Sequence, residues 1–186
     1  MRKIVFSLSV SLDGYFEGPE HDISWHHVDD ELHQYLNDTF RPMSAFLDGR
    51  VTHELMAAYW PTADETSDNG PTAEFAGIWR DKTKYVYSRD RDVSTDWNVT
   101  VVRSVSREEV LALKDEPGGD MVVGGANLAA EFFRLGLVDE VWLLVNPVAI
   151  GAGRSAFEVP VDLRLLGTRV FGNGVVQLRY AVAPSA

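Results

Sequence analysis

The feature that most constrains the fold of this chain is a buried strand that runs into two glycines and then directly into a helix. Residues 120–123 are Asp-Met-Val-Val, Gly124 and Gly125 follow, and the run from Ala126 carries apolar residues at helical spacing. Glycines at the start of a helix let backbone N–H groups and the helix dipole approach an anion closely. The segment therefore predicts an anion-binding turn between a strand and a helix.

Two further segments place comparable groups after expected strands. Gly49-Arg50-Val-Thr52 opens a helix, and Ser88-Arg89 ends a strand. Each has an ordinary alternative: Arg50 can be a solvated arginine at a helix start, and Arg89 can belong to a solvated charge run. Three such points at strand ends nevertheless suggest one extended polyphosphate ligand, and the added arginine suggests a phosphate monoester on it. That is the profile of a dinucleotide such as NADPH, on a scaffold without the Gly-x-Gly-x-x-Gly spacing of a Rossmann fold.

Hydrophobic periodicity predicts a single α/β domain over residues 1–186. Residues 3–12 alternate between an apolar face and a face of serines, which indicates a strand with one side in the core. Further strands are expected at 45–47, 84–87, 99–103, 120–123 and 138–148, and helices at 26–39, from Arg50, around 73–79, at 106–114 and from Gly125 to Gly136. Residues 163–171 and 175–182 predict a C-terminal hairpin, and the polar residues 60–72 a loop. This alternation implies a mostly parallel sheet with antiparallel edge strands and ligands at the carboxyl ends of its strands.

Charge and composition exclude several classes of function. The net charge of -11 argues against nucleic acid or an anionic membrane as a partner. The chain has no cysteine, so it offers no disulfide, no thiol nucleophile and no Cys-ligated zinc. Its 5 histidines contain no His-x-x-x-His pair, so no metal site is expected. The lack of cysteine makes a reducing cytosol the simplest location, so a cytoplasmic protein is expected. The N-terminal run meets Asp13 and Gly14 rather than a cleavage site, and no segment is long and apolar enough to span a membrane.

Here the chain resembles the dihydrofolate reductase-like superfamily. Gly49-Arg50-Val-Thr52-His-Glu54, Ser88-Arg89 and Val123-Gly124-Gly125-Ala126 match, in order, the three NADPH-contacting segments of those proteins. The likeness is closer to the reductase domain of the bifunctional riboflavin-biosynthesis deaminase–reductase and its stand-alone bacterial relatives. The segments shared with these are Ser11-Leu-Asp13-Gly14-Tyr15, Gly136-Leu-Val-Asp139-Glu140, Pro147-Val, Gly151-Ala-Gly153, Phe157 and Phe171-Gly-Asn-Gly. The cysteines of the zinc deaminase half are absent, so only the reductase half is expected.

The resemblance implies a cofactor site made of nine residues: Gly49, Arg50, Thr52, Ser88, Arg89, Gly124, Gly125, Ala126 and Asn127. Arg50 and Thr52 would hold the pyrophosphate, and Arg89 would bind the adenosine 2′-phosphate bidentately and thereby prefer NADPH over NADH. In dihydrofolate reductases the Gly-Gly peptide bond is cis, so a cis bond is expected between Gly124 and Gly125.

Reduction of a C=N bond also calls for a proton donor, and two carboxyl groups are candidates. Asp30 follows Trp25 at the spacing of the carboxylate that pairs with the pterin in dihydrofolate reductase. Its alternative role, with the neighbouring Asp29, is to favour a helix N-terminus. Asp13 ends the serine-lined strand, and its alternative role is that of a turn aspartate before a glycine. Arg154 stands either near a substrate anion or in a plain loop.

These features together predict an NADPH-dependent reductase of a C=N-type bond in a pyrimidinone- or pterin-like substrate. Two alternatives stay open: a nucleotide-binding or stress-related scaffold without turnover, and a flavin-using reductase. The long apolar strand at 138–148, together with the resemblance to riboflavin reductase domains, predicts a homodimer.

Overall fold

The structure of the protein is a computed structural model that describes residues 1–66, 70–89 and 93–183. Its strands are β1 (Ile4–Val10), β2 (Tyr15–Glu17), β3 (Ala45–Gly49), β4 (Thr83–Tyr87), β5 (Val99–Val102), β6 (Met121–Gly124), β7 (Glu140–Val145), β8 (Arg154–Ser155), β9 (Leu163–Val170) and β10 (Val176–Val182). Its α-helices are α1 (Asp30–Phe40), α2 (Arg50–Tyr59), α3 (Ala63–Thr66), α4 (Pro71–Asp81), α5 (Arg107–Asp115) and α6 (Ala126–Arg134). Two short 3-10 helices are η1 (Pro19–His21) and η2 (Trp60–Thr62).

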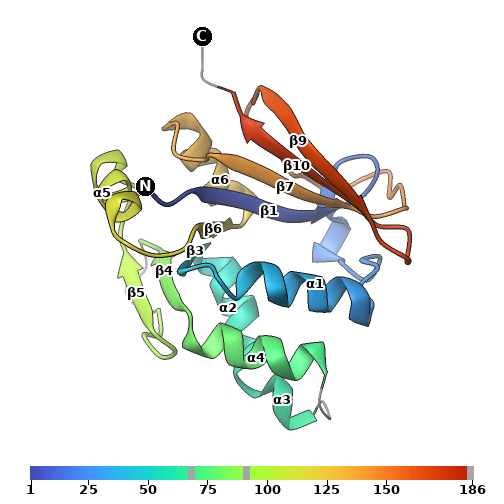
Figure 1. Cartoon of the computed structure of the whole chain (residues 1–186), viewed down its shortest axis with the longest axis horizontal. Coiled ribbons are helices and arrows are strands. Elements are labelled where there is room, and N and C mark those ends of the chain that lie inside the picture. Colours follow the sequence, from blue (N-terminus) through green and yellow to red (C-terminus); the bar gives the residue numbers. More distant parts are fainter. Residues whose placement is uncertain (67–69, 90–92, 184–186) are drawn as a thin grey trace.

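Eight strands form one sheet in the order β5-β4-β3-β6-β1-β7-β10-β9 (Figure 1). The strands from β5 to β7 are parallel, whereas β10 runs antiparallel to β7 and β9 antiparallel to β10. This is the expected mostly parallel sheet with the C-terminal hairpin at one edge. A small second sheet pairs β2 with β8. Because β7 is paired on both sides, a dimer cannot use its backbone edge.

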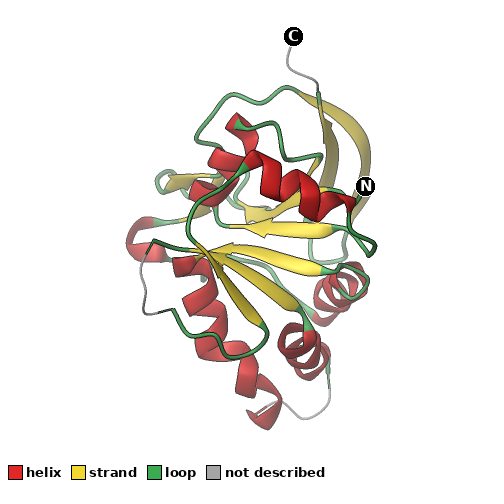
Figure 2. Ribbon diagram, turned by 90° about the vertical axis from the view of Figure 1, so that its left-hand side faces the viewer, coloured by secondary structure: helices red, strands yellow, loops and turns green. Residues whose placement is uncertain are grey.

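Helices cover both faces of the large sheet (Figure 2). The core under α5 and α6 contains Ile4, Phe6 and Phe132, and the core under α1, α2 and α4 contains Val5 and Phe75. Neighbouring residues of β1 thus point to opposite faces, as a period of two requires. The hydrophobic effect of burying these side chains is the main interaction that holds the two helical layers to the sheet.

Helix α6 ends near Gly136, as the sequence predicts. Gly136 adopts a φ of 63°, its N–H donates to the Phe133 carbonyl (3.0 Å), and the Leu137 N–H donates to the Phe132 carbonyl (2.9 Å). These two bonds form a Schellman motif, which satisfies carbonyls that the helix end leaves without partners. A glycine at this position therefore fixes where α6 stops and where the chain turns toward β7.

The prediction of a loop at 60–72 is wrong for most of the residues that the structure describes there. Residues 60–66 form η2 and α3, and α4 already begins at Pro71. Contacts from distant residues stabilise these helices: the ring of Trp60 packs on that of Phe75 at 4.5 Å, and Arg80 forms hydrogen bonds of 2.9 and 2.7 Å to the carboxylate of Asp64. The remaining residues of this expectation, 67–69, lie outside the described ranges.

Two other elements are shorter than the patterns predict. The helix expected from residue 26 begins only at Asp30, because Asp29 caps it by accepting a hydrogen bond from the Leu32 N–H (2.9 Å). The strand expected at 138–148 is the six-residue β7. In the described ranges no helix is long and apolar enough to cross a membrane.

Candidate functional site

The carboxyl ends of β4, β3 and β6 meet at one edge of the sheet, since these strands are neighbours. Gly49 pairs with Tyr87, the residue before Ser88, and Asp48 pairs with Gly124. The three segments singled out in the sequence therefore lie side by side, although about 75 residues separate the first from the last. Helices α2 and α6 both begin at this edge, so two sets of free backbone N–H groups and two positive dipole ends lie together.

Gly124 and Gly125 leave no room for side chains at this point. A Cβ atom on Gly124 would clash with Oδ1 of Asp48, and one on Gly125 would lie 2.7 Å from Oγ1 of Thr52. Gly125 also has a φ of 87°, which favours glycine. The backbone between β6 and α6 is consequently bare and lies against the first turn of α2. A bare backbone next to two helix N-termini is a geometry that fits a pyrophosphate.

The expected cis bond between Gly124 and Gly125 is wrong. This peptide bond is trans, as are all others in the described parts of the chain. The positive φ of Gly125 turns the chain from the strand into the helix, so the reversal needs no cis bond.

Two arginines lie at this edge, and their surroundings differ. Arg50 begins α2, and its Nη1 lies 2.8 Å from both carboxylate oxygens of Glu54, one helical turn away. Arg89 is exposed and follows Ser88, whose own N–H donates to the Val102 carbonyl (2.9 Å). The end of β4 is thus anchored to β5, and the Arg89 that follows it is exposed.

Arg154 connects the small sheet to the start of α6. Its Nη1 donates to Oε1 of Glu17 on β2 (2.8 Å), and its Nη2 donates to Oδ1 of Asn127 (2.6 Å). Its guanidinium lies 5.0 Å from the ring centre of Phe16. The loop before β8 therefore borders the site, and Asn127, Glu17 and Arg154 together fix the position of the β2–β8 ribbon.

The two expected proton donors, Asp13 and Asp30, are both exposed. The carboxylate of Asp13 is exposed and accepts hydrogen bonds from the backbone N–H groups of Ile150 (3.2 Å) and Gly151 (2.7 Å). Hydrogen bonds from Ser11 and from these amides hold the pKa of Asp13 below its usual value. Asp13 therefore ties two loops together. Asp30 lies exposed in the first turn of α1, which is the helix-start role that its sequence position also allowed.

The structure reveals a buried carboxyl group that sequence reasoning missed. Asp48 is 6% exposed, and burial raises its pKa from 3.8 to about 7, with the charge of Lys84 opposing the rise. Lys84 is fully buried and donates hydrogen bonds to the carbonyls of Trp79, Lys82 (2.8 Å) and Trp97 (2.8 Å). The one signal in the sequence is an acidic residue that directly follows an apolar strand and precedes Gly49.

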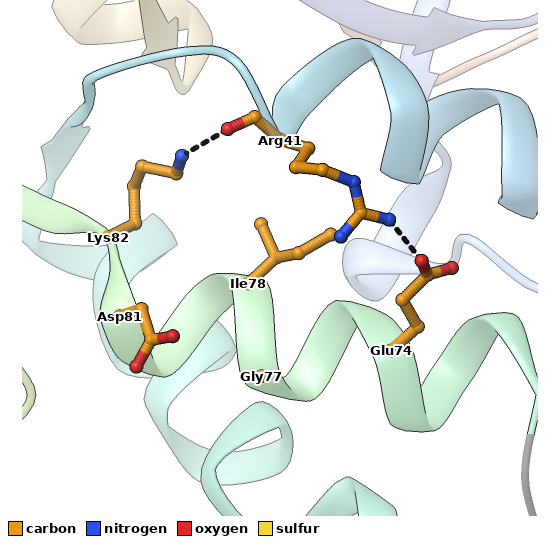
Figure 3. Close-up of a pocket in the computed structure, with 6 residues that line it drawn as sticks. All are labelled: Arg41, Glu74, Gly77, Ile78, Asp81 and Lys82. Carbon is orange, nitrogen blue, oxygen red and sulfur yellow. Dashed lines mark hydrogen bonds and ion pairs between the residues drawn. The ribbon is translucent and has the colours of Figure 1, made fainter.

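A hollow of about 340 Å³ lies elsewhere, between α1 and α4 (Figure 3). It is lined by Arg41, Glu74, Gly77, Ile78, Asp81 and Lys82. Arg41 and Lys82 precede β3 and β4, so the hollow lies near the amino ends of these strands. Gly124 and Gly125 lie at the opposite, carboxyl-end edge. The polar groups of the hollow already pair with one another: Arg41 with Glu74, and Lys82 Nζ with the Arg41 carbonyl (2.9 Å). In the described ranges no three His, Asp or Glu side chains are grouped as metal ligands.

Comparisons with known proteins agree with this architecture. The family model described as the RibD C-terminal domain matches residues 2–177. Two Bacillus subtilis proteins, uncharacterized protein YyaP and uncharacterized protein YwjB, are 33% identical over 183 residues and 30% identical over 187 residues. They cover 96% and 98% of this chain and 94% and 99% of their own length.

Solved structures share the fold at low sequence identity. A putative riboflavin biosynthesis protein from Shewanella sp. PV-4 superposes with a TM-score of 0.70 at 18% identity, covering 98% of this chain and 99% of its own. Dihydrofolate reductase from Enterococcus faecalis, complexed with NADP(H), gives a TM-score of 0.61 at 18% identity, covering 97% and 94%. RibD from Acinetobacter baumannii gives 0.65 at 16%, covering 98% of this chain and 58% of its own. The chain has the dihydrofolate reductase-like fold and belongs to the family of the RibD C-terminal domain.

Proposed function

We propose that this protein is an NADPH-dependent reductase that transfers a hydride to the C=N bond of a pyrimidinone- or pterin-like substrate. The observation that carries the proposal is the cradle formed by Gly124 and Gly125 against Thr52. There, bare backbone and two helix N-termini converge at one edge of the sheet. The E. faecalis dihydrofolate reductase of the same fold is itself a complex with NADP(H), which supports a nicotinamide cofactor.

The order of the strands gives the direction in which the cofactor would lie. Arg89 at the end of β4 would bind the adenosine 2′-phosphate, and the starts of α2 and α6 would bind the pyrophosphate. The nicotinamide would then lie over β6 and β1, on the side of Ser7 and Ser9. When bound, the cofactor supplies the hydride, while the protein holds donor and acceptor in contact and excludes water.

Because the whole protein is negatively charged, binding of NADPH would depend strongly on the arginines at the site. A net charge of -11 repels a ligand that carries several phosphate charges. Arg50 at the start of α2 and Arg89 after β4 would have to offset this repulsion locally. We expect removal of Arg89 to weaken NADPH binding about 10- to 100-fold, since a charge-assisted contact to phosphate is typically worth about 1.5–3 kcal/mol. NADH, which lacks the 2′-phosphate, should be unaffected.

The test is a titration of the protein with NADPH and with NADH, followed by quenching of tryptophan fluorescence. Arg89→Ala is compared with Arg134→Ala, an exposed arginine at the far end of α6. The proposal fails if NADPH does not bind, or if Arg89→Ala binds it as tightly as the wild type does.

Turnover distinguishes the reductase from its alternatives. Loss of NADPH absorbance is measured with 7,8-dihydrofolate and with a ribosylamino-pyrimidinone. Oxidation of NADPH with either compound supports the reductase, whereas saturable binding without oxidation supports a nucleotide-binding scaffold. A yellow purified protein would point to a flavin-using reductase instead.

A further inference from the structure

Three residues lie in a row across the sheet at the cofactor edge: Asp48 on β3, Gly124 on β6 and Ser7 on β1. Asp48 and Gly124 are register partners, and Ser7 follows Phe6, the partner of Val123. Each stands two residues after a member of the core under α1, α2 and α4, namely Phe46, Val122 and Val5. Because side chains alternate along strands, all three face that same side.

Gly124, the middle residue of this row, has no side chain, and the Asp48 carboxyl uses the space. Oδ1 of Asp48 lies so close to Gly124 that a Cβ atom on this glycine would clash with it. The carboxyl group thus leans from β3 over β6, toward Ser7 on β1. Since the nicotinamide would lie on the β1 side of the cradle, this orientation directs the carboxyl toward the reactive end of the cofactor.

Asp48 has hydrogen-bonding capacity that the described parts of the protein do not fill. Lys84, the charged group whose field reaches it, has three N–H donors, and all three go to backbone carbonyls. Arg50 on the neighbouring helix pairs with Glu54 instead. No hydrogen bond to the Asp48 carboxyl is formed within the described residues. The Asp48 carboxyl oxygens are not among the fully enclosed side-chain atoms that lack a partner. They therefore reach the surface of the site, where a bound ligand can supply a hydrogen bond.

We propose that Asp48 is the catalytic residue that holds the proton of the reaction, with its carboxyl facing the nicotinamide and the substrate nitrogen. This rests on the proposed function. The carbon of the C=N bond takes the hydride from the reduced nicotinamide, and a C–H bond forms. The π electrons of the C=N bond move to nitrogen, which takes the proton from the Asp48 carboxyl. The oxidised nicotinamide and an Asp48 carboxylate remain, and the carboxylate regains a proton from water.

Of the groups around Asp48, Lys84 is the other one that titrates close to neutral pH. Burial raises the pKa of Asp48 to about 7, so both of its protonation states are populated there. Lys84 faces it from β4, and its own pKa is lowered to about 8. His53 on α2 is buried, and burial together with the charge of Lys84 lowers its pKa, which keeps it neutral. Ser7 on β1 carries no charge.

The experiment compares dissociation constants for NADPH and NADP⁺ between pH 6 and 8.5. Both nucleotides carry the same 2′-phosphate, so its titration cancels in the ratio of the two constants. Only the nicotinamide ring differs, since it is cationic when oxidised and neutral when reduced. If Asp48 faces the ring, its ionisation favours NADP⁺. The ratio Kd(NADPH)/Kd(NADP⁺) should then rise about fivefold to tenfold through pH 7.

Asp48→Asn should abolish the rise through pH 7, which leaves only a change near pH 8 from Lys84. Glu108→Gln, at an exposed carboxylate on α5, should behave as the wild type does. A flat ratio in the wild type overturns the inference, and so does a rise through pH 7 that persists in Asp48→Asn. If Asp48→Asn does not fold, ¹³C NMR titration of the wild-type aspartate carboxyls replaces it. One carboxyl should titrate near pH 7 and shift to a lower pKa with NADP⁺ than with NADPH, and equal values overturn the inference. If neither nucleotide binds the wild type, the proposed function itself fails.

Discussion

Oδ1 of Asp48 lies within clash distance of the position that a Cβ atom on Gly124 would take. One side chain thereby fills the space that the other residue leaves empty, on two neighbouring strands whose registers align these residues. A side chain from another strand therefore favours glycine at position 124. This relationship predicts how substitutions at the two positions combine.

Gly124→Ala should destabilise the protein by about 1–3 kcal/mol, because the added methyl group forces the Asp48 carboxyl out of its place. Asp48→Ala in the same chain should remove most of that cost, so the two substitutions should not be additive. Urea unfolding of the two single variants and the double variant measures the coupling. Additive effects would show that Asp48 is not the obstacle.

Gly77→Ala is the matched control for a glycine-to-alanine change. Gly77 lies inside α4, and nothing stands within 4 Å of the position of an added Cβ. Alanine has the higher helix propensity, so this substitution should stabilise the protein by up to about 1 kcal/mol.

Asp48 should also make the stability of the protein depend on pH. Its pKa is about 7 in the folded protein against 3.8 ordinarily. Between these values the folded protein binds a proton that the unfolded chain does not, so the free energy of unfolding falls as pH rises from 4 to 7. The Asp48→Asn variant has no carboxyl group at this position, so its free energy of unfolding should not fall for this reason. Relative to the wild type it should gain about 2–4 kcal/mol between pH 4 and pH 8.

Urea unfolding of both proteins at several pH values measures this difference, and other titrating groups cancel in it. Glu108→Gln should follow the wild-type curve at every pH. A stability difference between Asp48→Asn and the wild type that does not change with pH would mean that the carboxyl is ionised in the folded protein throughout.

Glu54 competes with the phosphate that Arg50 is expected to bind. The Arg50 guanidinium already contacts both oxygens of the Glu54 carboxylate. Glu54→Gln removes this competing charge, so we expect NADPH to bind about two- to fivefold more tightly at low salt. The gain should shrink at high ionic strength, where both interactions are screened. Fluorescence titration measures it, and weaker binding would show that Glu54 orients Arg50 for the ligand instead.

Sequence reasoning succeeded where the signal is local. The strand, the two glycines and the helix around Gly124 are contiguous, and Gly136 stops α6 through bonds that span only a few residues. The sequence also predicted that Gly49, Ser88 and Gly124 would lie at the same edge. Parallel strands place their carboxyl ends together, whatever the length of chain between them.

It failed where a residue's role is set by distant parts of the chain. Asp48 looks like the polar end of a short strand until Gly124 is placed beside it. The carboxylate of Asp13 is taken up by backbone amides at residues 150–151, which no local pattern announces. Helix α3 is polar and turn-rich in sequence, and its Asp64 is paired with Arg80 on α4.

Asp139, in the segment that joins α6 to β7, pairs with a buried lysine. Lys114 Nζ lies 2.9 and 2.7 Å from its two carboxylate oxygens, and the Ile4 N–H donates to the same carboxylate at 2.7 Å. The Lys114 side chain is 5% exposed, whereas that of Asp139 is 35% exposed. Loss of the ion pair should therefore cost more when the buried Lys114 is left without its partner than when the partly exposed Asp139 is.

Asp139→Ala should cost about 3–5 kcal/mol, because it leaves the Lys114 ammonium buried without its counter-charge and frees the Ile4 N–H. Lys114→Met should cost only about 1 kcal/mol, since the partly exposed Asp139 carboxylate keeps water and the Ile4 N–H as partners. Thermal and urea unfolding at pH 7 measure both values. Equal costs for the two substitutions would mean that the lysine finds another partner, and a larger cost for Lys114→Met would mean that its methylene packing, rather than its charge, holds α5 to the sheet.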